Sequence, residues 1–373
     1  MSKINDLIKE LCPNGVPYKE IKELCHVTRG RVISKNELRE NEGEYPVYSS
    51  QTLNDGVFGK INTYDFDGEY VQWTTDGANA GSIFYRNGKF SVTNVCGLLK
   101  VKDEYKDKLN TNFLNYILGT VSKNYVNYAT SNPKLMSNVV EKIKVAVPPL
   151  EAQKEIVRIL DKFGELEAEL EAELEARKNQ YEFWRDKLLN EEYEIKYLPE
   201  LSDNLDNKRR PVTKSDRESG VFPYYGASGI VDYVSNYIFD DELLLISEDG
   251  ANLKARSTPI AFSSSGKVWV NNHAHVLKFY SRITQKYVEH YLNMIDLSEY
   301  ITGAAQPKLN QENLNKIRIN IPSSIKEQEK IVTVLERFDR LINDISSGLP
   351  AEIELRKKQY EYYRNKLLSF KEL

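Results

Sequence analysis

The fold is decided by a stretch in the middle of the chain, Val147-Pro148-Pro149-Leu150-Glu151-Ala152-Gln153-Lys154, and by the helical pattern that follows it as far as Leu189. Two prolines can open a helix but cannot lie inside one, and the only glycine or proline between them and Leu189 is Gly164. The stretch therefore predicts one helix of roughly 39 residues, about 58 Å long at 1.5 Å per residue. A helix of this length is longer than a single compact domain needs.

Apolar side chains recur along this helix at alternating spacings of four and three residues, which is typical of a helix that packs along another helix. A second segment, Gln328 to Leu368, repeats the pattern and supplies a partner in the same chain. The alternative is a solvated surface helix that turns its leucines toward its own domain. We expect the helix-pairing seam to consist of Ile156, Leu160, Phe163, Leu170, Leu174, Tyr181, Trp184, Leu188, Ile331, Leu335, Phe338, Ile342, Ile345, Tyr360, Tyr363 and Leu367.

The second half of the chain restates the first at an offset of about 175 residues, which marks a tandem repeat. Asp76-Gly77-Ala78-Asn79 returns as Asp249-Gly250-Ala251-Asn252, and Asn132-Pro133-Lys134-Leu135 returns as Gln306-Pro307-Lys308-Leu309. In each half, short strands between Gly, Asn and Asp turns precede one long helix. We therefore expect an α+β fold in which two similar mixed α/β modules are joined by two long antiparallel, coiled-coil-like helices with approximate twofold symmetry.

The expected boundaries follow the repeat. They place the first module at 1–147, the first long helix at 148–189, the second module at 190–322 and the second long helix at 323–373. Gly348 and Pro350 lie inside this last segment, and each favours the end or the start of a helix over its interior. We therefore expect the second helix to be broken near 346–350.

Composition places the chain among soluble intracellular proteins. A chain of 373 residues with 40% hydrophobic residues can bury the cores of about two domains. No apolar run is long enough to cross a membrane, and the first residues lack the apolar core of a signal peptide. Cys12, Cys25 and Cys96 are odd in number and read as reduced thiols. We expect a cytoplasmic protein with no membrane partner.

Charge neither requires nor excludes nucleic acid. The net charge is −4, and residues 148–189 alone carry 7 basic and 11 acidic side chains, so the acidic surplus is concentrated in the long helix. Arg, Lys, Asn and Gln are the side chains that contact base edges and phosphates. An ordinary solvated loop remains the competing interpretation for each one. The candidate DNA-binding residues are Arg29, Arg31, Lys35, Arg86, Asn132, Lys134, Lys208, Arg209, Arg210, Lys254, Arg256, Gln306 and Lys308.

Motifs that carry chemistry are missing from the sequence. There is no glycine-rich nucleotide loop, no Cys-x-x-Cys pair and no His-Glu-x-x-His. His273 and His275 lie one residue apart, but no further metal ligand stands at a convincing spacing, so we assign no metal site. Asp-Gly at 76 and 249 is first of all a turn signal. We therefore assign no catalytic residue and expect a binding protein.

The chain resembles the specificity subunit of a type I restriction-modification system over essentially its whole length. The resemblance rests on the tandem plan and on a set of short segments. These are Cys12-Pro13-Asn14-Gly15-Val16-Pro17-Tyr18, the helix entries at 147–153 and 321–328, Gly348-Leu349-Pro350-Ala351-Glu352-Ile353, and the pairs Gln180-Tyr181 and Gln359-Tyr360. The second helix entry departs from the pattern, with Ser323-Ser324 where the first repeat has Pro149-Leu150.

The resemblance implies a role and a set of partners. Each module would be a target-recognition domain reading one half of a split site in double-stranded DNA, and the helices would set the spacing. Two modification subunits would dock on the helices, and restriction subunits would join them. The chain itself would be non-catalytic and without a cofactor, with S-adenosylmethionine and ATP on the partner subunits. The alternative function is a two-headed coiled-coil adaptor that binds a partner other than DNA.

Overall fold

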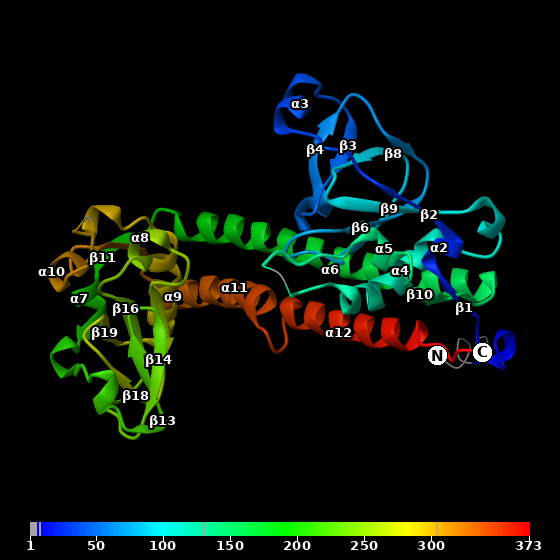
Figure 1. Cartoon of the computed structure of the whole chain (residues 1–373). Helices are drawn as coiled ribbons and strands as arrows, with labels where there is room; N and C mark the ends of the chain where they lie inside the picture. The colour runs from blue at the N-terminus through cyan, green and yellow to red at the C-terminus, as the bar shows by residue number, and fades with distance from the viewer. Residues whose placement is uncertain (1–5, 7–8, 130, 304) are drawn as a thin grey trace. The chain divides into compact units, whose positions relative to one another are not determined.

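The computed structural model describes residues 6, 9–129, 131–303 and 305–373. They divide into two compact units (Figure 1). Unit 1 is Met1–Glu169 with Ile353–Leu373, and unit 2 is Leu170–Glu352. Each unit therefore combines one globular module with parts of both long helical regions.

The first module contains two four-stranded sheets, ordered β2-β9-β6-β7 and β4-β3-β8-β5, and a separate pair formed by β1 and β10. All pairings are antiparallel except β3 with β8, which is parallel. The strands are β1 Tyr18–Glu20, β2 Cys25–Arg29, β3 Tyr45–Tyr48, β4 Val57–Ile61, β5 Phe66–Asp67, β6 Tyr70–Thr74, β7 Ile83–Arg86, β8 Lys89–Val92, β9 Cys96–Val101 and β10 Lys144–Ala146.

The second module repeats this topology, with sheets ordered β12-β19-β16-β17 and β14-β13-β18-β15 and a pair formed by β11 and β20. Its one parallel pairing, β13 with β18, stands where the first module has β3 with β8. The repeat that the sequence predicts is therefore a repeat of fold. The strands are β11 Glu194–Tyr197, β12 Ser202–Asn204, β13 Ser219–Gly226, β14 Gly229–Val234, β15 Phe239–Asp240, β16 Leu243–Ser247, β17 Ala261–Ser264, β18 Lys267–Val270, β19 Ala274–Phe279 and β20 Arg318–Ile321.

One longer helix covers a sheet in each module, and the other helices of the modules are single turns or little more. The longer ones are α4 Thr111–Val121 and α9 Arg282–Met294. The shorter α-helices are α2 Ile21–Leu24, α3 Lys35–Glu40, α5 Ser137–Val140, α7 Leu198–Leu201, α8 Asn252–Ala255 and α10 Gln311–Leu314. The 3-10 turns are η1 Leu53–Gly56, η2 Asp103–Tyr105, η3 Ser122–Tyr125, η4 Asp206–Lys208, η5 Lys214–Asp216 and η6 Ser298–Tyr300.

Large aromatic side chains fill the space between sheet and helix. Trp73 of β6 is fully buried and donates its indole N–H to the carbonyl of Leu135 at 3.0 Å. Its ring lies over Gly97 on the neighbouring strand, where a Cβ atom would come within 2.1 Å of the ring, so only glycine fits there. In the second module Tyr287 of α9 is fully buried, and its hydroxyl donates to the carbonyl of Asn320 at 3.0 Å.

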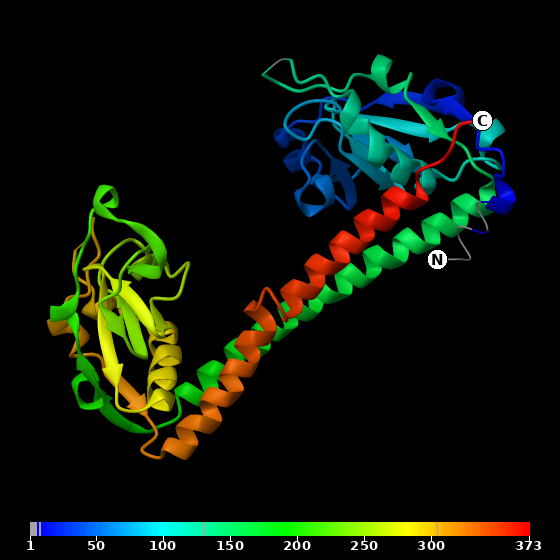
Figure 2. The same cartoon turned by 90° about the horizontal axis from the view of Figure 1, so that it is seen from below.

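The first long helix, α6 Leu150–Leu189, is continuous over 40 residues. Within unit 1 its first half lies beside α12 Leu349–Leu367, as both views show (Figure 2). Phe163 stacks on Tyr363 with ring centroids 5.5 Å apart, and Glu167 forms an ion pair with Lys357 at 3.4 Å. Residue numbers rise along one helix as they fall along the other, so the two segments run antiparallel.

Within unit 2 the last part of α6 packs with α11 Ile325–Asn343. The rings of Tyr181 and Phe338 are 6.3 Å apart, and Leu188 packs against a core that contains Ile331 and Leu335. These contacts involve the apolar positions expected for the seam. In unit 1 the core likewise includes the seam residues Ile156, Leu160 and Leu367, with Tyr360 and Tyr363 against it.

The turn between α11 and α12 departs from the expected seam. The side chain of Ile345 is 86% exposed in this turn, so its assignment to the seam is wrong. Asp344 accepts bonds from the backbone and hydroxyl groups of Ser346 and Ser347, and this turns the chain away from the helix axis. Of the other seam positions, Ile342 is buried, while Leu170, Leu174 and Trp184 are half-buried.

A search of the described residues for membrane-spanning helices found none with the required length and apolar character.

Candidate nucleic-acid interface

In the first module the Asp-Gly turn after β6 is the anchor for a polar loop. Gly77 has a positive φ of 92° and donates its amide to the carbonyl of Pro133 at 3.0 Å. Leu135 donates its amide to the carbonyl of Thr75 at 2.9 Å. These two bonds hold the Asn132–Lys134 loop against the turn.

Two cations of the predicted set lie beside this turn. The guanidinium of Arg29, at the end of β2, donates to the carbonyl of Asn94 at 2.6 Å and to the hydroxyl of Thr75 at 3.1 Å. It lies 3.8 Å from the Asp76 carboxylate, and the Lys134 ammonium lies 3.7 Å from the same group. Both cations are partly exposed, so the structure brings Arg29, Asn132 and Lys134 into one cluster at the end of β6.

The second module builds the same loop arrangement from the matching residues. Gly250 has a φ of 105° and donates its amide to the carbonyl of Pro307 at 3.1 Å, and Leu309 donates to the carbonyl of Glu248 at 2.7 Å. The Gln306–Lys308 loop is thereby held against the Asp249-Gly250 turn. The side chain of Lys308 is 52% exposed and forms an ion pair with Glu248 at 3.2 Å.

Several other candidate residues present polar side chains to solvent. Lys208 lies in η4, and Arg210 follows shortly after it; both are exposed. In the first module Lys35 is exposed at the start of α3. Lys254 on α8 is also exposed and donates to the carbonyl of Gly303 at 3.4 Å. Contact of these side chains with DNA stays a prediction.

The charge of Arg31 is paired with acidic residues of the first module. Its guanidinium contacts Glu37 at 2.6 Å and Asp65 at 3.0 Å, and its side chain is 43% exposed. The hydrogen bond to Glu37 is the main reason that its pKa is raised above the ordinary arginine value. Arg31 can meet a phosphate only by giving up part of these contacts.

The prediction of DNA contact is wrong for Arg86. Its side chain is only 3% exposed and lies at the end of β7. The guanidinium donates to the side chain of Gln72 at 2.8 Å and to the carboxylate of Asp55 at 2.6 Å, and it lies 3.7 Å from the ring centre of Tyr48. Arg86 therefore has a structural role, because protein groups surround its guanidinium.

Arg256 and Arg209 also direct their donors to protein acceptors. Arg256 has a left-handed backbone with φ of 52° and donates to the carbonyls of Leu292 and Ile295 at the end of α9, at 3.1 and 2.5 Å. Burial lowers its pKa below the ordinary arginine value. The side chain of Arg209 is 14% exposed and bonds Glu248. We therefore do not keep these two arginines as candidate base contacts.

Sequence reasoning missed the acidic partners in the second module. The two histidines one residue apart were visible in the sequence, but Asp206 and Glu248 lie far from them along the chain. In the structure His273 faces Asp249 at 2.9 Å and His275 faces Asp206 at 2.6 Å. The only sign of these acidic partners in the sequence comes from the repeat, in which Glu248 takes the place of Thr75 of the first module.

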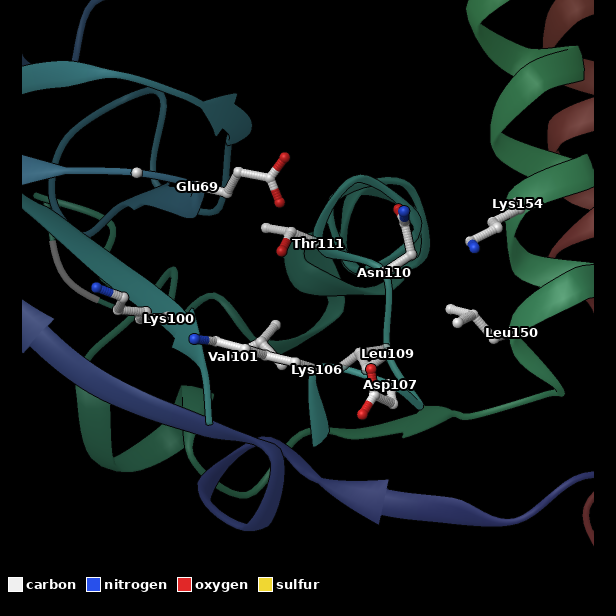
Figure 3. A pocket seen from close by; sticks show the side chains of 11 residues that line it. Glu69, Lys100, Val101, Lys106, Asp107, Leu109, Asn110, Thr111, Leu150 and Lys154 are labelled. Carbon is white, nitrogen blue, oxygen red and sulfur yellow. The ribbon is translucent and has the colours of Figure 1, made fainter. Parts of the chain in front are cut away.

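A pocket of unit 1 lies where α4 and α6 begin (Figure 3). Lys100, Lys106 and Lys154 line it together with the acidic residues Glu69 and Asp107. The mixture of signs gives the pocket no clear preference for an anion or a cation. None of the candidate DNA-binding residues lines it, so we do not include it in the interface.

Comparison with known proteins agrees with the repeated architecture. The family described as "Type I restriction modification DNA specificity domain" matches twice, over residues 13–176 and 190–355. A type I specificity subunit of Mycoplasma pneumoniae is 34% identical over 369 residues, covering 95% of this chain and 97% of the relative. A second one from the same organism is 35% identical over 337 residues, covering 84% of this chain and 97% of the relative.

Solved structures share the fold at low identity. The S subunit of a type I restriction-modification system from M. genitalium aligns with a TM-score of 0.64 at 15% identity, covering 95% of this chain and 97% of that one. A chain from a study of type I complex assembly aligns with a TM-score of 0.57 at 14% identity, covering 96% and 98%. The two matched domains and the full-length relatives together show that this chain belongs to the type I restriction-modification DNA specificity family.

Proposed function

We propose that the chain is the sequence-reading subunit of a type I restriction-modification complex and that each module reads one half of a split site in double-stranded DNA. The observation that carries the proposal is the repeated loop cluster. In both modules a Pro-Lys loop is bonded to an Asp-Gly turn through the same two backbone hydrogen bonds. Each cluster presents lysine and amide side chains on a rigid sheet, which suits contacts to phosphates and base edges.

The long helices give the proposal its second part. Continuous over 40 residues, α6 spans about 60 Å at 1.5 Å per residue. We propose that its length sets the separation of the two half-sites and that two modification subunits dock on the helical segments, with restriction subunits joining the complex. S-adenosylmethionine and ATP would be bound by those partners. The chain itself would contribute recognition, since the family to which it belongs is one of DNA specificity domains.

This division of roles follows the boundaries 1–147, 148–189, 190–322 and 323–373. The two intervals of strands and short helices would read DNA, and the two helical intervals would space and dock. The compact units cut across these intervals because each module packs against residues from both long helical regions. The adaptor alternative is not favoured, because both halves match a DNA specificity domain.

Methylome sequencing of host cells with and without the gene tests the proposal. We expect one split DNA motif to be methylated in the parent and unmethylated in the deletion strain, and restored when the gene is returned. Unchanged methylation would overturn the proposal. A modified motif without two separated halves would overturn the assignment of one half to each module.

A further inference from the structure

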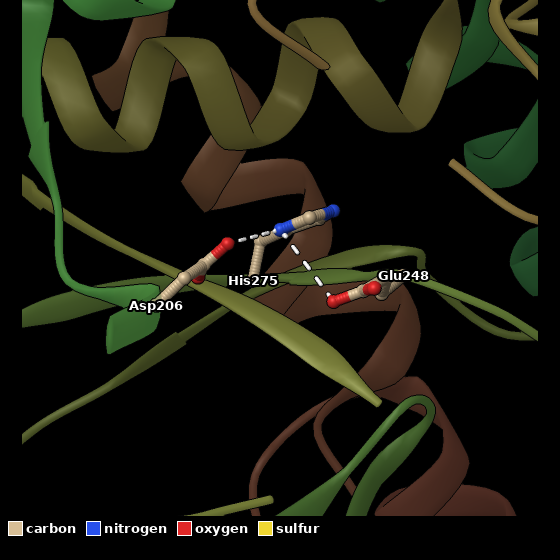
Figure 4. A group of neighbouring side chains, drawn as sticks. All are labelled: Asp206, Glu248 and His275. Atoms are coloured by element: carbon tan, nitrogen blue, oxygen red, sulfur yellow. Dashed lines mark hydrogen bonds and ion pairs between the residues drawn. The ribbon is translucent and has the colours of Figure 1, made fainter. Parts of the chain in front are cut away.

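The second module contains a buried histidine bonded at both ring nitrogens. The side chain of His275, on β19, is 1% exposed. Its Nδ1 atom lies 2.6 Å from a carboxylate oxygen of Asp206, and its Nε2 atom lies 2.7 Å from the carbonyl oxygen of Leu309. Figure 4 shows the ring between Asp206 and Glu248, the latter 3.8 Å from Nδ1.

Both partners of the ring are hydrogen-bond acceptors. An imidazole donates to both oxygens at once only when each ring nitrogen carries an N–H. Burial raises the pKa of the Asp206 carboxyl, but the hydrogen bond and charge of His275, the amide of Val276 and the charge of Arg209 together bring that pKa below the ordinary value. The ring of His275 therefore connects Asp206 with the backbone at Leu309.

The carboxylate of Glu248 is paired with cations of the protein. Glu248 contacts Arg209 at 2.5 Å and Lys308 at 3.2 Å. Burial raises the pKa of Glu248, and the bond to Arg209, the charge of His275 and the bond to Lys308 lower it below its ordinary value. Because two cations already occupy the carboxylates and both ring nitrogens are in use, the group is a closed ionic network.

The first module lacks the histidine of this network. The pairing of β6 with β9 places Gly97 opposite Trp73, and the pairing of β16 with β19 places His275 opposite the matching residue Ile246. Glycine therefore stands where the second module has His275. The two modules share a fold, but only one of them has a buried histidine at this position.

We propose that His275 is a positioning residue for DNA reading by the second module. The inference rests on the proposed function. One ring bond holds the carbonyl of Leu309, directly after the loop that presents Gln306 and Lys308. The other holds Asp206, which opens the segment that presents Lys208 and Arg210. A single ring thereby contacts both exposed loops, one through a backbone carbonyl and the other through the Asp206 carboxylate.

The groups that face His275 are Asp206 from η4, Glu248 from the end of β16, Arg209 beside them and Lys308 from the loop. The neighbouring pair of His273 and Asp249 is half-exposed and separate from the ring.

The test uses the chain assembled with its modification subunits and the split site found by methylome sequencing. Binding is measured for the intact duplex and for duplexes with either half scrambled. For the parent protein we expect at least tenfold weaker binding with either scrambled duplex. For His275→Gln, which cannot donate to both oxygens, we expect less than threefold discrimination at the second half-site and parental discrimination at the first. Retention at the first half-site shows that the variant has folded.

Two further measurements separate positioning from simple structural loss. The chain has four histidines, so the ring nitrogens of His275 can be identified by ¹⁵N NMR as the signals that disappear in His275→Gln. We expect both ring nitrogens to carry an N–H in the parent, and the signal of the nitrogen that faces Asp206 to change in Asp206→Asn. Asp206→Asn should also weaken discrimination at the second half-site and leave discrimination at the first as in the parent. His26→Gln, at an exposed position on β2, is the matched control and should behave as the parent.

The outcomes distinguish the two proposals. A parent complex without preference for any duplex would overturn the proposed function. If the parent reads both half-sites, the inference is overturned by a His275 ring nitrogen without an N–H or by undiminished reading of the second half-site in His275→Gln. Equal loss at both half-sites would also overturn it, because that result means a general structural role.

Discussion

Gln153 and Gln328 occupy matching positions in the first turns of α6 and α11, and each donates its side-chain amide to a proline carbonyl. The distances are 2.7 Å to Pro148 and 2.6 Å to Pro322. Both side chains are buried, and each also accepts a hydrogen bond from the start of the module's own longer helix. The donors are the Asn110 amide at α4 and the Thr284 hydroxyl at α9, each at 2.8 Å. The same residue type therefore ties a long helix to a module twice.

Replacing Gln153 by alanine should destabilise unit 1. The change leaves the Asn110 amide and two carbonyl oxygens without their partner, and buried unsatisfied groups of this kind cost roughly 1–3 kcal/mol. We expect the loss in chemical denaturation of the purified chain. Gln180→Ala, at an exposed position of α6, is the control and should change stability by less than about 0.5 kcal/mol. Equal effects of the two changes would contradict the role of Gln153.

Replacing Arg86 by methionine should lower stability without changing the charge that DNA meets. The guanidinium bond to Gln72 is buried and the bond to Asp55 is partly buried, and hydrogen bonds to charged groups contribute about 1.5–3 kcal/mol. We expect a lower unfolding midpoint and an unchanged salt dependence of DNA binding. Lys35→Met, which removes an exposed charge, should leave the unfolding midpoint nearly unchanged. A flatter salt dependence in Arg86→Met would return this residue to the interface.

Replacing both Lys208 and Arg210 by alanine should weaken DNA binding equally for different sequences. If each side chain neutralises one phosphate, the slope of log affinity against log salt should fall by roughly 0.9 for each phosphate that is no longer neutralised. The measurement is a salt titration of the complex on specific and unrelated duplexes. Lys316→Ala removes a lysine already paired with Glu312 and should leave the slope unchanged. An unchanged slope in the double variant would place both residues on a solvated face.

Adding four residues to α6 at Leu170 should change the spacer of the DNA site and leave both half-sites as they are. The addition lengthens a helix by about 6 Å, close to two base pairs at about 3.4 Å each. Methylome sequencing of a strain with the lengthened chain gives both quantities at once. The same addition at Ser346, in the turn between α11 and α12, lengthens no helix and should keep the spacer. Altered half-sites would contradict the proposed separation of roles.

Thiol labelling tests whether Cys25 and Cys96 are buried in the first module. Burial raises the pKa of Cys25 to about 12 and that of Cys96 to about 11, so both remain thiols at pH 8, while the thiolate is the reactive form. We expect iodoacetamide to modify the half-exposed Cys12 first and the other two only after unfolding. Mass spectrometry of the parent and of Cys12→Ser measures this order. Rapid labelling of Cys25 in the native chain would contradict the packing around β2.

Much of the fold could be predicted because it depends on patterns that are local in sequence. Two prolines followed by an uninterrupted helical pattern predict the long helix, and the structure begins α6 at Leu150, directly after Pro149. The repeat then predicts a second copy of the module, which the matched sheet order confirms. These features required no knowledge of distant contacts.

The candidate site could be predicted less well because its geometry depends on such contacts. Arg86 and Lys35 are both basic residues of the first module, yet one is buried against Tyr48 and the other is exposed. The partners of Arg86 are distant in sequence, and one of them, Asp55, lies thirty-one residues away along the chain. The pairing of His275 with Asp206 spans sixty-nine residues and was invisible for the same reason.

The core of unit 1 includes Leu367 and Leu368, with Phe370 packed against it. A ribosome makes these residues more than two hundred positions after the last strand of the first module, β10. The module that is synthesised first must therefore wait, with part of its apolar surface uncovered, until translation reaches the second repeat's final helix. The second module and α11 are made in one continuous run after α6, so unit 2 can complete its core earlier. The core of unit 2 is thus complete before the core of unit 1, although the first module is synthesised first.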